Sequence, residues 1–392
     1  MGRSQRTYPL VLLLLSGLIV FVALTPLFFV ASYAISIGWD EAVGLIWRPR
    51  VGELFANTGL LVSGCVALTA VFGTGAAWLV ERTTLPGRRV WNVLLVAPLA
   101  VPAFVNSFGW VSLTARVEGY AGALLVVSLS YYPLVYLPVA AMLRGLDPAL
   151  EETAAALGYG PWHTFARVVL PQLRPALLGG TLIVALHTLA EFGALQLLRF
   201  PTFTTAIYDL YRSSFNGPAA NMLAGVLLLC CLLILTLELR LRGHHRYSRL
   251  GRGSARTIPR RTLGRLSAPC LLAVGGLATL ALGVPLASLT YWLVTGSSTS
   301  FPIGDLVTTT ATSLGLGVAG ALVSMALAFP IAWLCVRRRG RLTILLERCT
   351  YFGNAVPGIV VALALVTVAI RVARPIYQTL VLLVLAYAIM FL

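Results

Sequence analysis

The sequence contains no lysine. All 29 basic residues are arginines, and with only 13 acidic residues they give a formal net charge of +16. A phosphate-binding P-loop needs a lysine after its glycine-rich turn. We therefore expect no ATPase site on this chain, no catalytic residues and no cofactor bound by it.

Charged residues of either sign are also scarce: they make up 11% of the 392 residues, against 58% hydrophobic residues and a mean hydropathy of +0.89. These values exclude a water-soluble globule. An apolar run of about 20 residues is long enough to cross roughly 30 Å of hydrocarbon as a helix. Such runs occur near 9–36, 54–80, 91–114, 120–143, 176–197, 221–241, 266–294, 306–336, 349–370 and 376–392. The sequence predicts an all-α integral membrane protein with about ten transmembrane helices in the lipid bilayer.

The arginines lie between these runs. With the N-terminus placed in the cytoplasm, 22 of the 29 fall in cytoplasmic segments, nine of them between Arg240 and Arg265. The positive-inside rule favours this orientation. The arginines are then anchors beside anionic lipid rather than a nucleic-acid surface. The six cysteines lie in or beside the spans, and the four histidines are scattered, so we expect neither a disulfide framework nor a metal site.

The two ends of the chain resemble each other. A constant offset of 255 aligns residues 77–79 with 332–334, Arg82 with Arg337, residues 100–102 with 355–357, Arg116 with Arg371, Tyr132 with Tyr387 and Leu137 with Leu392. Such a match predicts a tandem parallel repeat. We expect a first transmembrane domain over 1–241, a basic cytoplasmic linker over 242–265 and a second domain over 266–392. Because the second copy stops at the counterpart of Leu137, we expect the complete protein to continue for roughly 100 to 150 residues.

The loop over 144–175 is punctuated by residues that start and stop helices. Asp147 followed by Pro148 predicts an N-cap and first turn, and Gly158 ends that helix. A second short helix starts after Gly160, and Pro171 is expected to interrupt it. The expected result is a compact helix-turn-helix at the inner membrane surface. Four apolar side chains are available to a partner's groove: Leu150, Leu157, Trp162 and Phe165.

The spacing in this loop is similar to a known motif. The loop reads Glu152-Thr153-Ala154, then three residues, Gly158, nine residues and Val168-x-Leu170-Pro171. It resembles the EAA loop of binding-protein-dependent ABC importer permeases. Thr153 stands where the family has alanine, and Val168 where it has isoleucine. The resemblance implies the six-helix permease fold, with an incomplete second copy in this chain. The residues implied in coupling are Asp147, Glu151, Glu152, Thr153, Ala154, Gly158, Leu170 and Pro171.

The same resemblance implies partners. Residues 147–161 would form a coupling helix that docks on a separate ATP-binding subunit, present in two copies and carrying the ATP and magnesium. A periplasmic or extracellular substrate-binding protein would deliver the cargo at a bacterial cytoplasmic (inner) membrane. Complete family members carry a second EAA loop, and by the offset the counterpart of Glu152 would be position 152 + 255 = 407.

Two further segments, 191–193 and 203–208, look like the ferric-iron branch of the family, in which one polypeptide supplies both halves. The resemblance therefore implies ferric iron as substrate. Thiamine, polyamine, phosphonate and sulfate permeases share the scaffold and remain alternatives.

Glu191 is an acid within an apolar span, which is costly and marks a candidate functional residue. His187 lies one turn before it, and Asn106 accompanies prolines in an earlier span. These three residues are candidates for the translocation path. A helix-to-helix hydrogen bond made by Glu191 is an equally open interpretation.

Two other classes of protein remain. One is a secondary transporter built from parallel repeats and driven by an ion gradient through Glu191. The other is a membrane anchor that does not transport. The EAA-type loop favours the importer, because a gradient-driven carrier has no use for a cytoplasmic docking helix.

Overall fold

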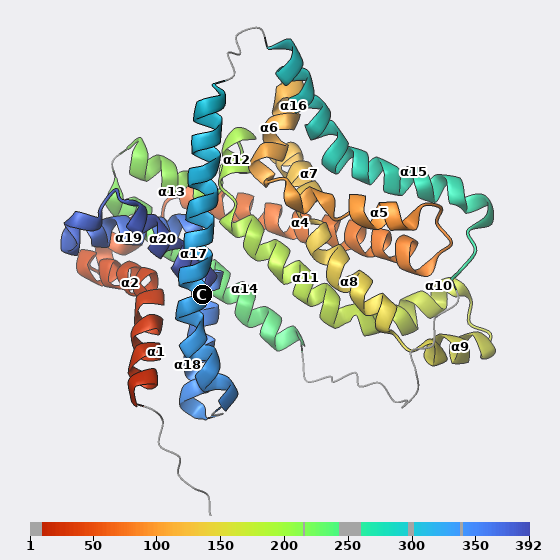
Figure 1. Ribbon diagram of the computed structural model, residues 1–392, viewed down its shortest axis with the longest axis horizontal. Helices are drawn as coiled ribbons and strands as arrows, with labels where there is room; N and C mark the ends of the chain where they lie inside the picture. The colour runs from red at the N-terminus through yellow and green to blue at the C-terminus, as the bar shows by residue number, and fades with distance from the viewer. Residues whose placement is uncertain (1–9, 215, 243–259, 297–301, 338–339) are drawn as a thin grey trace, which may run out of the picture. The chain divides into compact units, whose positions relative to one another are not determined.

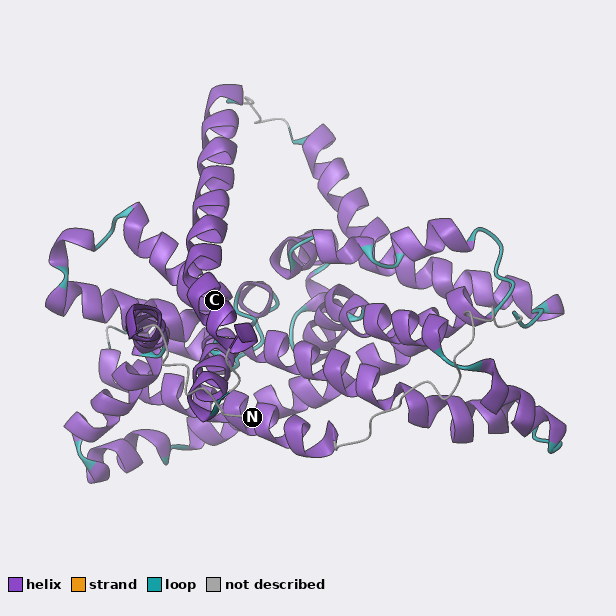
Figure 2. Cartoon of the chain, turned by 60° about the horizontal axis from the view of Figure 1, so that its bottom comes forward, coloured by secondary structure: helices purple, strands orange, loops and turns teal. Residues whose placement is uncertain are grey.

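The computed structural model describes residues 10–214, 216–242, 260–296, 302–337 and 340–392. Within these ranges the chain is helical and contains no strand (Figure 1, Figure 2), so the all-α prediction is confirmed. The first half contains α1 Leu10–Ala23, α2 Thr25–Ile37, α3 Trp39–Ile46, α4 Pro49–Arg82, α5 Arg88–Leu94, α6 Ala103–Leu113, α7 Tyr120–Tyr131, α8 Pro133–Gly145, α9 Pro148–Ala156, α10 Pro161–Thr164, α11 Leu170–Ala190 and α12 Gly193–Leu197. It is followed by α13 Phe203–Arg212, α14 Gly217–Arg242, α15 Ser267–Ala278, α16 Val284–Thr295, α17 Ile303–Arg337, α18 Arg341–Ala355, α19 Gly358–Val372 and α20 Leu380–Phe391.

The helices form two compact units. One comprises residues 53–205 and 233–296, and the other comprises 1–52, 206–232 and 297–392. Residues 243–259, which include most of the predicted 242–265 linker, lie outside the described part of the chain. The division into domains 1–241 and 266–392 stays a prediction.

Six helical stretches among the described residues are long and apolar enough to cross a membrane. They are Pro49–Arg82, Tyr120–Gly145, Pro161–Ala190, Gly217–Leu237, Gly264–Thr295 and Ile303–Arg337. Two bent pairs raise the number to eight if each pair is one span. The last two predicted spans correspond to α19 and α20, which have 15 and 12 residues and are shorter than the roughly 20 needed for a straight crossing. The structure thus supports six to eight of the ten predicted spans.

The run predicted as a single span over 91–114 is broken. The stretch Arg88–Ala100 meets α6 at an angle of 93°. Val101 at the break is extended, with φ −102° and ψ 115°. The ring of Pro102 disfavours a helical conformation in the residue before it, which explains the break at this position. The first run bends less, by 54° between α1 and α2, beside Pro26 in the first turn of α2.

Pro171 does not interrupt a helix, contrary to the expectation from sequence. The helix runs from Pro161 to Ala190 through a π-helical turn at Phe165–Val169, and Pro171 occupies the first turn of α11. In this turn the Leu170 N–H donates to the Phe165 carbonyl, five residues back. Such a bulge makes room for the proline ring without ending the helix. The span predicted over 176–197 instead ends at Ala190.

The unit of residues 53–205 and 233–296 is packed around α8. A methyl group added at Gly73 of α4 would lie 2.8 Å from the Val135 Cβ, and one added at Gly180 of α11 would lie 2.9 Å from the Val135 Cα. The absence of a side chain at both glycines therefore allows α4 and α11 to approach the backbone of α8 closely. Figure 1 shows α8 and α11 running side by side.

The other unit contains α1, α2 and α17 to α20. Gly320 on α17 faces the ring of Tyr387 on α20, where an added methyl group would lie 3.1 Å from that side chain. Ile19, Val20 and Ile331 are buried together in a small apolar cluster of this unit.

The close approach at Gly73 predicts a specific cost. Gly73→Ala places a methyl group against Val135 and should lower stability by about 1–3 kcal/mol through overpacking. Gly75→Ala on the same helix meets no atom within 4 Å, so it should leave stability unchanged or slightly raise it. Thermal unfolding of the purified protein in detergent measures both, and equal midpoints for the two variants would contradict the packing described.

Candidate functional site

The EAA-type loop begins with a capped helix. The Asp147 Oδ1 accepts a hydrogen bond of 3.0 Å from the Ala149 N–H, which satisfies one free donor of the first turn of α9. Thr153 bonds back to the Ala149 carbonyl at 2.7 Å, and Ala154 is buried. The helix predicted from the sequence is therefore present and begins where Asp147 was expected to cap it.

A glycine turn ends this helix. Gly158 has φ +81°, a conformation that suits glycine, and the Tyr159 N–H donates to the Ala154 carbonyl at 3.0 Å. The turn leaves Leu157 and Trp162 on the surface, 71% and 78% exposed. Leu150 is also exposed, so three of the four side chains predicted for a partner's groove are accessible.

Phe165, the fourth, is only partly exposed. Its ring packs edge-on against Trp78 of α4 with 4.6 Å between ring centroids, and it stacks on Trp162 at 5.6 Å. Phe165 thereby attaches the second helix of the loop to the end of α4. Leu170 and Pro171, the last residues of the motif, are partly buried in the first turn of α11.

The two adjacent glutamates of α9 point in different directions. The Glu151 side chain is only 14% exposed, and its Oε1 lies 3.0 Å from the Nη1 of Arg82, whose side chain is 5% exposed. Its Oε2 lies 4.0 Å from the Nη2 of Arg261. Glu152 is exposed to solvent. Glu151 therefore ties α9 to the end of α4, whereas Glu152 is presented outward.

A second set of polar contacts holds α8, the helix that leads into this loop. The Arg144 Nη2 lies 2.7 Å from the Glu81 Oε1, and the Tyr136 hydroxyl donates to the Asn92 Oδ1 at 2.6 Å. The loop is thus anchored on both sides through the last turn of α4, at Glu81 and Arg82.

Glu191 occupies a helix break rather than a helix interior. It follows α11 with an extended backbone, φ −68° and ψ 126°. One carboxylate oxygen accepts from the Ala194 N–H at 2.9 Å, and the other accepts from the Tyr131 hydroxyl of α7. Its carbonyl accepts from the Thr204 hydroxyl at 2.6 Å. The carboxylate therefore bonds across helices, which is one of the two interpretations that the sequence left open.

The other two pathway candidates lie in different surroundings. His187 is exposed, bonds the Ile183 carbonyl at 3.0 Å and packs edge-on against the ring of Tyr131. Tyr131, rather than a direct bond, thus connects His187 with Glu191. Asn106 is buried and donates to the Ser130 hydroxyl at 2.7 Å, while its Oδ1 has no hydrogen-bond partner among the described residues.

Possible metal ligands do not gather in the part of the chain that is described: it holds no group of three or more His, Cys, Asp or Glu side chains placed to bind a metal ion. All six cysteines are free.

Residues 8–294 match a family profile described as the binding-protein-dependent transport system inner membrane component. The chain belongs to this family. It is a permease of the ABC importer type, an inner-membrane component of a transport system rather than an enzyme.

The permease is similar to three characterised relatives. It is 39% identical over 372 residues to the Fe(3+)-transport system permease protein FbpB 2 of Haemophilus influenzae, covering 94% of this chain and 73% of that protein. It is 30% identical over 256 residues to the sulfate transport system permease protein CysT of Escherichia coli, covering 59% and 92%. It is also 30% identical over 153 residues to the molybdenum transport system permease protein ModB of Escherichia coli, covering 34% and 66%.

Three side chains that contact the predicted site residues were not predicted from the permease sequence. Arg82 and Arg261 hold Glu151, and Tyr131 holds Glu191. Arg82 stood out only as one of the repeated positions, and Arg261 only as part of a basic linker. Tyr131 and Glu191 are 60 positions apart in the sequence, so no local pattern predicts their pairing.

The different surroundings of the two glutamates predict different effects on stability. Glu151→Gln removes the charge that compensates buried Arg82 and should lower the stability of the permease by about 3–5 kcal/mol. Glu152→Gln, one residue away and exposed, should change stability by less than about 0.5 kcal/mol. Thermal unfolding in detergent compares the two variants directly. Equal destabilisation would show that Glu151 does not hold the loop in place.

Proposed function

We propose that this permease is the transmembrane subunit of an ATP-driven importer and that residues 144–175 couple it to a separate ATP-binding subunit. The observation that carries the proposal is the contrast between anchored and exposed side chains in this loop. Glu151 anchors the helix to α4, while Leu150, Leu157 and Trp162 present exposed apolar area on the same loop. A helical loop that is anchored to its own protein and also presents accessible apolar side chains is suited to docking.

The proposal assigns ATP and magnesium to the partner. The permease has no lysine for a P-loop, so the energy of hydrolysis must reach it through contact. Because α9 is tied to α4 by an ion pair, and the helix that begins at Pro161 after the Gly158 turn continues into α11, a displacement of the loop would move both α4 and α11. We propose two ATP-binding subunits and a periplasmic or extracellular binding protein that delivers the substrate.

The arginine distribution supports an orientation with the N-terminus in the cytoplasm. In that orientation the loop over 144–175, Arg82 and the linker share the cytoplasmic side. A gradient-driven carrier is less favoured, because the Glu191 carboxylate is already engaged by Ala194 and Tyr131.

We also propose that the chain contains a tandem parallel repeat, with the ten spans that this implies. Helix bounds support it: shifted by 255, α4 covers 304–337 and α17 covers Ile303–Arg337. Pro102 precedes α6 with φ −55° and ψ 141°, and its counterpart Pro357 precedes α19 with φ −58° and ψ 138°. The last pair agrees less well, since α7 shifts to 375–386 whereas α20 covers Leu380–Phe391.

We propose ferric iron as the cargo. Support comes from the relative named as an Fe(3+)-transport permease, which matches 94% of this chain, whereas the sulfate permease matches 59%. Sulfate, molybdate, thiamine, polyamine and phosphonate remain alternatives within the family. Glu191, His187 and Asn106 stay candidates for the path: His187 is exposed, and the buried Asn106 Oδ1 has no hydrogen-bond partner among the described residues.

Docking predicts that a charge on the exposed face of the loop weakens the complex. Leu157→Glu should reduce co-purification of the ATP-binding subunit by about 10-fold or more, because it places a carboxylate in an apolar contact. Leu266→Glu alters a leucine that is 63% exposed outside the loop, and it should leave the complex intact. If Leu157→Glu binds the ATP-binding subunit as tightly as the wild type, residues 147–161 are not the docking helix.

The proposed cargo is tested by uptake. Cells that lack their own ferric-iron importer and express this permease with its binding protein and ATP-binding subunit should accumulate radiolabelled ferric iron. They should not accumulate labelled sulfate or molybdate above the vector control. Cells that express the Leu157→Glu variant are the control for passive entry, because this variant should not be coupled to the ATP-binding subunit and should accumulate no labelled iron above the vector control. Uptake of sulfate or molybdate in place of iron would overturn the substrate assignment and leave the coupling proposal standing.

A further inference from the structure

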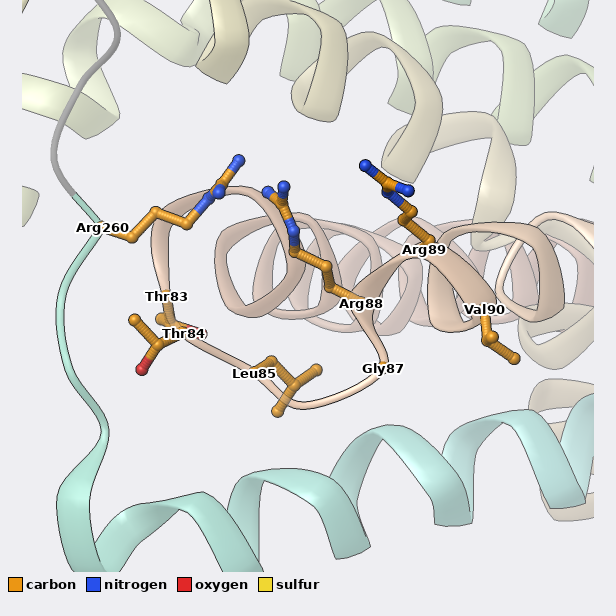
Figure 3. A pocket seen from close by; sticks show the side chains of 8 residues that line it. All are labelled: Thr83, Thr84, Leu85, Gly87, Arg88, Arg89, Val90 and Arg260. Carbon is orange, nitrogen blue, oxygen red and sulfur yellow. The ribbon is translucent and has the colours of Figure 1, made fainter.

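A basic cavity lies beside the end of α4. Its volume is about 510 Å³, and it is lined by Thr83, Thr84, Leu85, Gly87, Arg88, Arg89, Val90 and Arg260. Three of these eight residues are arginines, and none is acidic. Figure 3 shows the Arg260 and Arg88 side chains pointing toward each other, with Arg89 extending on the same side of the 83–90 loop.

Backbone pairing holds Arg260 at this cavity although it is far from the loop in sequence. The Arg261 N–H donates to the Arg82 carbonyl at 2.9 Å, and the Thr84 N–H donates to the Arg261 carbonyl at 3.0 Å. These two bonds form an isolated parallel bridge between Thr83 and Arg261. The position of Arg260 is therefore built into the fold of this unit.

The arginines near this cavity differ in whether they have an acidic partner. Arg82 and Arg261 share Glu151, and Arg144 is paired with Glu81. Arg88, Arg89 and Arg260 form no ion pair within the described ranges. Glu81 does line an adjoining cavity of about 180 Å³ together with Arg88 and Arg89, but its Oε1 lies 2.7 Å from Arg144. Three guanidinium groups thus face one small space with no carboxylate of their own.

This arrangement suits a phosphate group. Guanidinium groups bind phosphate oxygens through paired, charge-assisted hydrogen bonds. We propose that the cavity binds the phosphate headgroup of an anionic phospholipid. The source is lipid because the cavity lies at the arginine-bearing end of the apolar α4 stretch, and the positive-inside rule places such an end at the membrane surface. On α5, Val90 and Val93 are 61% and 67% exposed and offer apolar area to an acyl chain. Neither the coupling loop nor the proposed path uses this cavity.

The first test uses the wild-type permease alone, purified as the full chain in a neutral detergent. Dioleoylphosphatidylglycerol and dioleoylphosphatidylcholine are titrated separately, and native mass spectrometry counts the bound lipid. Phosphatidylglycerol should bind at least 10-fold more tightly, because the choline cation of the second lipid opposes the arginines. Equal binding of the two lipids overturns the proposal. Displacement of phosphatidylglycerol by an equal concentration of inorganic phosphate also overturns it, since the site would then belong to free phosphate.

The second test locates the site. Arg89→Gln with Arg260→Gln should weaken phosphatidylglycerol binding by about 10-fold or more, because each substitution removes charge-assisted hydrogen bonds to the phosphate. Arg240→Gln with Arg265→Gln removes the same charge from two exposed arginines outside the cavity and should leave binding nearly unchanged. Equal losses in the two variants would mean diffuse attraction and overturn the site. Thermal unfolding checks that both variants are folded, and the wild-type titration decides the proposal if either is not.

Discussion

A backbone inside a bilayer has no water to bond, so a helix can stop there only where protein groups take up its free donors and acceptors. At the helix break after Ala190, which ends the apolar stretch Pro161–Ala190, Glu191 supplies such groups. Its carboxylate takes the Ala194 N–H and the Tyr131 hydroxyl, and its carbonyl takes the Thr204 hydroxyl. One residue therefore joins α7, the break between α11 and α12, and the start of α13. The cost of an acid at this position is offset by bonds that a neutral apolar residue cannot make.

The same unit is held by close backbone contacts around Val135, where Gly73 and Gly180 allow α4 and α11 to approach α8. This packing matters for α9, because only two residues separate it from the end of α8. The pair of Arg82 and Glu151 then fixes α9 from the side. A force applied to the exposed face of α9 therefore acts on α4 and α8 together, which is what coupling to a partner requires.

The arginines divide into two kinds once their neighbours are known. Arg82 and Arg144 form ion pairs with carboxylates and stabilise the fold. Arg88, Arg89 and Arg260 instead line a cavity that has no acidic residue in its lining. The number of arginines in each loop predicts only which side of the membrane that loop occupies. It therefore does not distinguish paired arginines from those that line the cavity. Their separate roles follow from which acid each guanidinium reaches in space.

The sequence by itself determined the features that depend on neighbouring residues: the apolar spans, and the capped helix that begins at Asp147 and turns at Gly158. A cap, a glycine turn and a membrane span are each set by residues a few positions apart, and the loop spacing that identified the family is equally local. Two proline positions show the limit of such local rules. Pro102 breaks a span at 93°, whereas Pro171 is accommodated by a π-helical turn and leaves its helix continuous.

Only the tertiary structure decided the roles of individual side chains. Glu151 and Glu152 are chemically identical neighbours, and only the position of Arg82, some 70 positions earlier in the chain, makes one an anchor and leaves the other exposed. Glu191 likewise acquires its partner from another helix, at Tyr131. These pairings arise from how helices distant in sequence pack, and one sequence carries no pattern that records such contacts.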